Sequence, residues 1–176
     1  ELCAEAVRLA RDIGDTGRYS EALHDLGYYV AMGGDLPRAK PLLLESLNLA
    51  KEVGHMLVMI WCLETTGRIA AEEHATIVAA KLTGAADTHR EAMGRPREPK
   101  LQADMKAALG MGPAQVGTTT WNHSYQEGRA MALEQATALA KEYVTGQCTG
   151  FQQPTQPSHP RAHNEGGEGT TVKGTS

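Results

Sequence analysis

A short segment near the start of the chain recurs 40 residues later. Residues 9–14 read LARDIG and residues 49–54 read LAKEVG, so apolar, basic, acidic and glycine positions keep their register. The same offset relates Leu23 to Leu63 and Gly27 to Gly67. A fixed spacing of this size indicates stacked copies of one unit, because such a unit cannot bury its apolar face alone.

Each copy is predicted to be a pair of antiparallel helices. In the first copy, Leu23, Leu26 and Val30 follow helical spacing over 19–32, and the glycines at 33 and 34 end that helix. Pro37 suits the first turn of the next helix, which runs to about 53. The second copy predicts helices over 57–73 and 76–93, with a turn at Glu73-His74 that lacks glycine.

The spacing of small residues resembles that of tetratricopeptide units. Gly27 and Ala39 lie twelve positions apart, as do Gly67 and Ala79, and in that family two small residues at this spacing let the paired helices pack closely. The usual unit has about 34 residues, and we expect the additional residues of this chain to lie in the loop between units. The resemblance implies an all-α, tetratricopeptide-like α-solenoid of antiparallel helix pairs over residues 1–95.

The repeat fades after Pro96, although helical patterns continue. We predict a short amphipathic helix up to Gly110, a helix that starts at Gly112-Pro113 and is broken at Gly128-Arg129, and a last helix over 133–144. The second of these carries Trp121 and Tyr125 four residues apart, a spacing more typical of core packing than of ligand stacking. Residues 96–145 are expected to form a helical cap on the open end of the stack.

A more specific resemblance covers roughly residues 22–139. The blocks at 79–86 (AAKLTGAA), 90–94 (REAMG) and 125–131 (YQEGRAM) are similar to C-terminal regions of bacterial STAND-type predicted ATPases and LuxR-type transcription regulators, which are tetratricopeptide-like. Two features depart from that pattern: Ala132 stands where Ser or Thr often caps the last helix, and no helix-turn-helix follows. The chain opens with Glu1 inside a helical pattern, so we expect it to be a piece of a longer protein.

Composition restricts the partners of the chain. The net charge is -4 and no run of Lys and Arg appears, which argues against a direct nucleic-acid contact. No apolar run is long enough to span a membrane, and the three cysteines form neither a disulfide framework nor a metal pair. We expect a cytoplasmic protein in which Cys3 and Cys62 are small buried residues.

The residues from 146 onward differ in composition from the rest. They are mostly Gly, Pro, Gln, Thr and Ser, so we predict a disordered tail over 146–176. The glycine-rich stretch 165–174 lacks the Gly-Lys-Ser/Thr order of a phosphate loop. His159 and His163 have the spacing of a helical zinc pair, but Pro157 and Pro160 argue against a helix there.

No residue pattern indicates catalysis, a metal or a cofactor. The segments 72–74 (EEH) and 87–89 (DTH) are predicted to lie on solvated helix faces, since catalytic use would need a third group fixed by the fold. We therefore expect the chain not to be an enzyme. A hydrolase that uses His74 or His89 remains as an alternative from a different class.

The predicted register places one set of side chains in a concave groove between the first helices of each pair. These positions are Glu21, His24, Tyr28, Ala31, Trp61, Glu64, Arg68 and Ala71. We expect His24, Tyr28, Trp61, Glu64 and Arg68 to bind a ligand, because they combine aromatic anchors with charged hydrogen-bonding groups. The expected ligand is a protein, a peptide or another domain of the same parent chain. The resemblance implies a sensor arm of a signalling ATPase or transcription regulator; the alternative is a free-standing scaffold unrelated to ATP or transcription.

Overall fold

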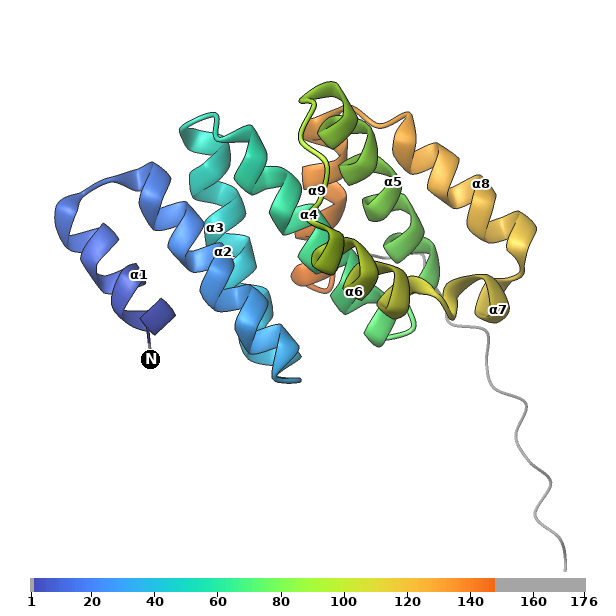
Figure 1. Ribbon diagram of the computed structural model, residues 1–176, viewed down its shortest axis with the longest axis horizontal. Helices are drawn as coiled ribbons and strands as arrows, with labels where there is room; N and C mark the ends of the chain where they lie inside the picture. Colours follow the sequence, from blue (N-terminus) through green and yellow to red (C-terminus); the bar gives the residue numbers. More distant parts are fainter. Residues whose placement is uncertain (1, 148–176) are drawn as a thin grey trace, which may run out of the picture.

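The computed structural model describes residues 2–147, and within that range the chain is helical without a β-strand (Figure 1). This confirms the predicted all-α fold class. The helices are α1 (Leu2–Ile13), α2 (Thr16–Met32), α3 (Leu36–Glu52), α4 (Met56–Glu72), α5 (Thr76–Ala92), α6 (Pro99–Leu109), α7 (Gly112–Val116), α8 (Thr118–Arg129) and α9 (Leu133–Val144). The predicted tail lies outside the described residues except for 146 and 147, which form the turn after α9. No helix in the described range is long and apolar enough to cross a membrane.

Helices α2 to α5 have the same length and the same kind of connection. Each contains 17 residues, and three-residue turns join them at 33–35, 53–55 and 73–75. The prediction that additional residues lie in the loop between units is therefore wrong, because every connection is equally short. The 40-residue spacing instead results from two helices of 17 residues and two turns of three residues.

One turn geometry ends each of these helices. Gly34 and Gly54 have positive φ angles of 86° and 69°, and the residue after each donates its backbone N–H to a carbonyl five residues earlier. Glycine suits this position because it has no Cβ to clash in the left-handed region. His74 occupies the equivalent position of the third turn at φ 62°, which explains how a helix ends there without glycine.

The small residues at the predicted twelve-residue spacing are buried between paired helices. A Cβ at Gly27 would lie 3.1 Å from Leu43 of α3, and one at Gly67 would lie 3.4 Å from Leu82 of α5. Ala39 and Ala79 have no exposed surface. The expectation that these positions allow close helix packing is confirmed.

Helix α4 lies at the centre of the molecule. It contacts α2, α3 and α5, and residues from the second half of the chain cover it further: α6 crosses in front of it and α9 passes behind it in the view of Figure 1. Most of its residues are buried accordingly, as expected for a helix that is apolar all round. Residues 96–145 also contribute to the main core, because Leu133, Ala136 and Ala140 of α9 belong to it.

Helix α8 packs against α5 at glycine contacts. A Cβ at Gly84 would lie 2.1 Å from the Tyr125 carbonyl oxygen, and a Cβ at Gly128 would lie 2.0 Å from the Lys81 carbonyl oxygen. Gly128 therefore serves close packing in the last turn of α8, and the predicted break at Gly128-Arg129 is confirmed, because α8 ends at Arg129. The helix predicted from Gly112 is two helices, since Gly117 at φ 85° separates α7 from α8.

Helix α9 is attached to the first half of the chain by polar contacts as well. Lys40 Nζ of α3 donates to both carboxylate oxygens of Glu73 at 2.8 and 2.7 Å, and the Tyr143 hydroxyl of α9 donates to the same carboxylate. The N-cap of α9 is Ala132, whose N–H is accepted by the Gln135 side chain at 2.9 Å. Gln135 supplies half of a capping box where no Ser or Thr is present.

Candidate functional site

A hollow of about 660 Å³ lies over α4, between α2 on one side and residues 95–105 on the other. Helix α4 forms its floor with Leu57, Trp61, Thr65 and Arg68. All five residues predicted to bind a ligand line this hollow: His24, Tyr28, Trp61, Glu64 and Arg68. The sequence did not indicate the second wall, which comes from α6 and the link before it.

Aromatic side chains form the α2 side of the hollow. The His24 ring stacks on Tyr28 with centroids 6.3 Å apart and contacts Trp61 at 5.5 Å. Thr65 Oγ1 lies 3.1 Å from His24 Nε2, which fixes the buried imidazole. Tyr29 is 62% exposed beside the half-buried Tyr28, as expected for adjacent residues of a helix. The result is a rigid aromatic surface at the edge of the hollow.

Arg68 lies at the bottom of the hollow, where two of its guanidinium nitrogens contact neighbouring side chains. Its Nε donates to Glu72 Oε1 at 3.0 Å, and its Nη1 contacts the sulfur of Met32. The side chain is 20% exposed, so a ligand can still reach part of the guanidinium. Arg68 is therefore a cation held in place by its own helix.

Three of the positions predicted for the groove lie elsewhere. Ala31 is buried in a cluster with Leu43 and Ile69, and Ala71 packs against the main core. Glu21 pairs with His55 Nε2 at 3.0 Å and does not line the hollow. Of the eight predicted groove positions, these three belong to contacts between helices, and the other five line the hollow.

Glu64 does not have the ligand-binding role that the sequence predicts for it. Its side chain is only 4% exposed, because two arginines cover it. Arg90 of α5 donates through Nη2 at 2.8 Å and through Nε, and Arg97 Nε lies 2.7 Å from Glu64 Oε1. Glu64 is thus the buried anchor of two arginines and, in this arrangement, does not face a ligand.

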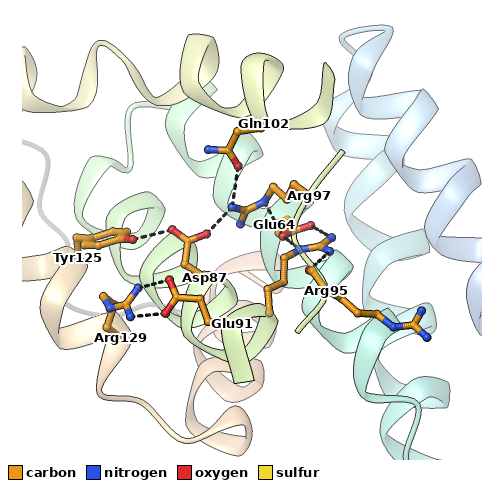
Figure 2. A network of polar contacts seen from close by, with 9 residues as sticks. Glu64, Asp87, Glu91, Arg95, Arg97, Gln102, Tyr125 and Arg129 are labelled. Atoms are coloured by element: carbon orange, nitrogen blue, oxygen red, sulfur yellow. Dashed lines mark hydrogen bonds and ion pairs between the residues drawn. The ribbon is translucent and has the colours of Figure 1, made fainter. Parts of the chain in front are cut away.

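The polar network extends from Glu64 across the end of α5 (Figure 2). Arg97 Nη1 contacts Asp87 Oδ1 and lies 3.4 Å from Gln102 Oε1. The Tyr125 hydroxyl of α8 donates to Asp87 Oδ2 at 2.7 Å. Burial first, and the neighbouring carboxylate second, raise the pKa of Tyr125. The prediction that residues 87–89 form a solvated face is wrong for Asp87, whose side chain is 19% exposed.

A second ion pair joins α5 and α8 at the surface. Arg129 donates to both oxygens of Glu91 at 3.0 and 2.6 Å (Figure 2). This two-point contact lowers the pKa of Glu91 and raises that of Arg129. With the glycine contacts, it fixes α8 on α5.

The wall opposite the aromatic residues carries exposed charges. Arg95 and Lys100 are exposed, and neither makes an ion pair in the part of the chain that the structure describes. Glu98 and Asp104 lie beside them on the same wall. Both signs of charge are therefore available to a ligand opposite an aromatic surface, and aromatic and arginine side chains are the residue types enriched in protein interfaces.

The remaining candidates for chemistry have structural contacts. Across residues 2–147, no group of three or more His, Cys, Asp or Glu could hold a metal ion. Burial raises the pKa of Cys62 to about 12, whereas Cys3 is only half-buried. His74 contacts Gln115, and His89 contacts the Met131 carbonyl. His159 and His163 lie outside the described residues.

Comparisons with protein-family models, with curated proteins and with solved structures found no match to this chain. The candidate site therefore rests on its own geometry. This geometry defines a helical protein with an open hollow beside a buried ionic network. The hollow is lined by aromatic and charged side chains.

Proposed function

We propose that this chain is a non-catalytic interaction module, which binds a segment of a protein in the hollow over α4. The observation that carries the proposal is the pairing of an aromatic side, with Tyr28 and Trp61, and an exposed charged side, with Arg95 and Lys100, across one hollow. Buried Tyr, Trp and Arg side chains contribute most of the affinity in protein interfaces. A volume of about 660 Å³ suits a few side chains of such a segment.

The proposed context is a sensor arm. A tetratricopeptide-like stack in a signalling ATPase or a LuxR-type regulator would bind a protein, peptide or neighbouring domain, and this binding would shift the parent protein between states. A free-standing scaffold is the second candidate. The hollow supports it as well as it supports a sensor arm, because both would bind a protein segment there. Sequencing the gene upstream of the codon for Glu1 separates them, because a Walker motif there supports the first.

Phage display tests the binding surface and does not require an identified partner. Peptides selected on the unmodified chain should bind the Tyr28→Ala/Arg68→Ala double variant at least about tenfold more weakly than they bind the unmodified chain. The reason is that the double variant lacks both an aromatic and an arginine anchor. The matched control is Arg11→Ala/Tyr19→Ala, which removes the same residue types from a contact between α1 and α2. Equal loss of affinity in both variants, or in neither, would contradict the assignment of the hollow.

A further inference from the structure

The link after α5 inserts one arginine into the buried network beside the hollow. We use the name strap for residues 95–109, which comprise this link and α6. Arg97 of the strap is 6% exposed and lies between Glu64 of α4 and Asp87 of α5. Figure 2 shows the guanidinium between these carboxylates. Together, Glu64 and Asp87 form a socket for a guanidinium group, because two carboxylates meet different edges of it.

Both carboxylates of the socket have a second partner that does not belong to the strap. Glu64 retains two contacts from Arg90, and Asp87 retains the Tyr125 hydroxyl. Breaking a buried ion pair is strongly unfavourable when it leaves a buried charge without a partner. Withdrawal of Arg97 avoids this cost, because both carboxylates keep their second partner. The socket remains intact when its arginine leaves.

Arg97 itself is incompletely satisfied in the docked position. Its Nη2 is buried without a hydrogen-bond partner among the described residues, whereas its Nε forms an ion pair with Glu64 at 2.7 Å. A buried donor without a partner destabilises the position that holds it. Water would satisfy Nη2 if the strap moved away, so this donor gains hydration when Arg97 leaves.

The strap is also loosely packed. Met105 is the only fully buried residue of α6, and α6 has no side-chain N-cap. Three hollows of about 660, 370 and 340 Å³ border the strap. Segments with few buried apolar contacts open at low free energy. The strap is thus weakly packed, and its one buried arginine, Arg97, can leave the socket without isolating a buried carboxylate.

We infer that the strap is an internal occupant of the Glu64–Asp87 socket, and that it leaves to admit an arginine-bearing apolar helix of a partner protein. The strap indicates the chemistry of that partner: an arginine for the socket, followed by apolar side chains four residues apart, as in Leu101 and Met105. Its departure would also join the hollow over α4 to the two hollows beside α5. The inference deepens the proposed function and rests on it for the existence of a partner.

Hydrogen exchange on the unmodified chain tests whether the strap opens by itself. Backbone amides of α6 should exchange at least about tenfold faster than those of α4 and α5, because local opening requires less free energy than global unfolding. Exchange of α6 at the same rate as α4 and α5 would overturn the inference. This measurement does not involve a ligand, so it can succeed even where the proposed function fails.

A peptide with the sequence of residues 94–109 tests the socket in trans. The full chain with Arg97→Ala should bind the labelled natural peptide at least about tenfold more tightly than the unmodified chain does, because its own arginine no longer competes. The matched control peptide carries the same Arg97→Ala change and should bind at least about tenfold more weakly than the natural peptide. Fluorescence anisotropy measures all four combinations.

The outcomes against the inference are distinct. Equal binding of the two peptides to the Arg97→Ala chain, or no binding of either, would overturn the socket as a recognition site. Failure of the Arg97→Ala chain to fold, seen as loss of helical circular dichroism, would also overturn it, because reversible departure requires the remaining helices to be stable without Arg97. If the natural peptide binds the Arg97→Ala chain as expected but the phage-display test contradicts the hollow, recognition takes place at the socket and not at the aromatic side.

Discussion

Residues 16–92 and residues 93–147 are both helical, but different interactions fix their arrangement. In the first region, helices of equal length alternate with three-residue turns. In the second, helix lengths vary from 5 to 12 residues, and long-range contacts such as Arg97–Glu64 and Tyr143–Glu73 determine position. Local signals suffice for helices of equal length joined by short turns, whereas the position of the helices in the second region depends on individual side chains.

The largest expected effect is on the network that joins the two regions. Glu64→Ala should lower the free energy of unfolding by about 3–5 kcal/mol, because it leaves the buried Arg90 and Arg97 without their shared carboxylate. Urea denaturation measures the change. Glu72→Ala is the matched control on the same helix: Glu72 pairs with Arg68 nearer the surface, and its loss should change stability by about 0.5 kcal/mol or less. Similar losses for the two variants would contradict the difference in burial.

Glycine-to-alanine changes separate the two regions directly. Gly84→Ala should destabilise the chain by about 3 kcal/mol or more, because the new Cβ meets the rigid backbone of α8. Gly27→Ala should stay within about 1 kcal/mol of the original chain, because its neighbour is the movable Leu43 side chain and alanine favours helix. Thermal unfolding compares the two variants. A more damaging Gly27→Ala would show that the regular stack is the more tightly packed region.

The turn at residue 74 offers a stabilising change. His74→Gly should raise the free energy of unfolding by up to about 1 kcal/mol, because glycine relieves a positive φ that disfavours other residues. The melting temperature should increase by about 2–4 °C. His123→Gly, inside α8, is the control with the opposite expected sign, since glycine weakens helices by about 1 kcal/mol. A decrease for both variants would mean that the His74–Gln115 contact outweighs the relief of strain.

The smallest expected effect depends on pH. The Glu91 pKa is lowered by Arg129, so this carboxylate contributes stability above its ordinary pKa of about 4.5, and the contribution is lost as the pH falls through the lower folded-state value. Glu91→Gln should therefore flatten the decrease in melting temperature between about pH 5 and pH 3. The pair is exposed, so the effect should shrink in high salt. Identical pH profiles for the two chains would remove this contact from the forces that hold α8.

The sequence predicted the regular region well because its signals are local. The ends of α2 to α5 lie within three residues of the predicted ones, since glycines, Pro37 and apolar spacing mark them. The true unit is a single helix and turn of 20 residues, a period that Gly14, Gly34, Gly54 and Gly94 mark in the sequence. His74 interrupts that series at a positive φ; histidine is enriched among non-glycine residues in this conformation, but it is far less diagnostic of it than glycine.

The second region could be predicted only as a set of helices. Its helical periodicity was visible, but the placement of α6 across α4 depends on Arg97 finding Glu64, 33 positions earlier in the chain. The sequence marks Gly128 only as the end of a helix and gives Gly84 no special role, and only the structure shows that each glycine packs against the backbone of the other's helix. The sequence therefore predicts the groove residues of α2 and α4. It does not predict those of the strap, because the position of the strap depends on the long-range contact between Arg97 and Glu64.

The position of α9 has a consequence for how the chain is made. Its apolar face completes the core behind α4, and Tyr143 reaches a carboxylate 70 residues earlier. A nascent chain that has emerged only as far as α8 would leave that apolar surface open to water. Folding therefore cannot finish until the end of this region has left the ribosome, and until then the growing chain depends on fast completion or on chaperones to avoid association.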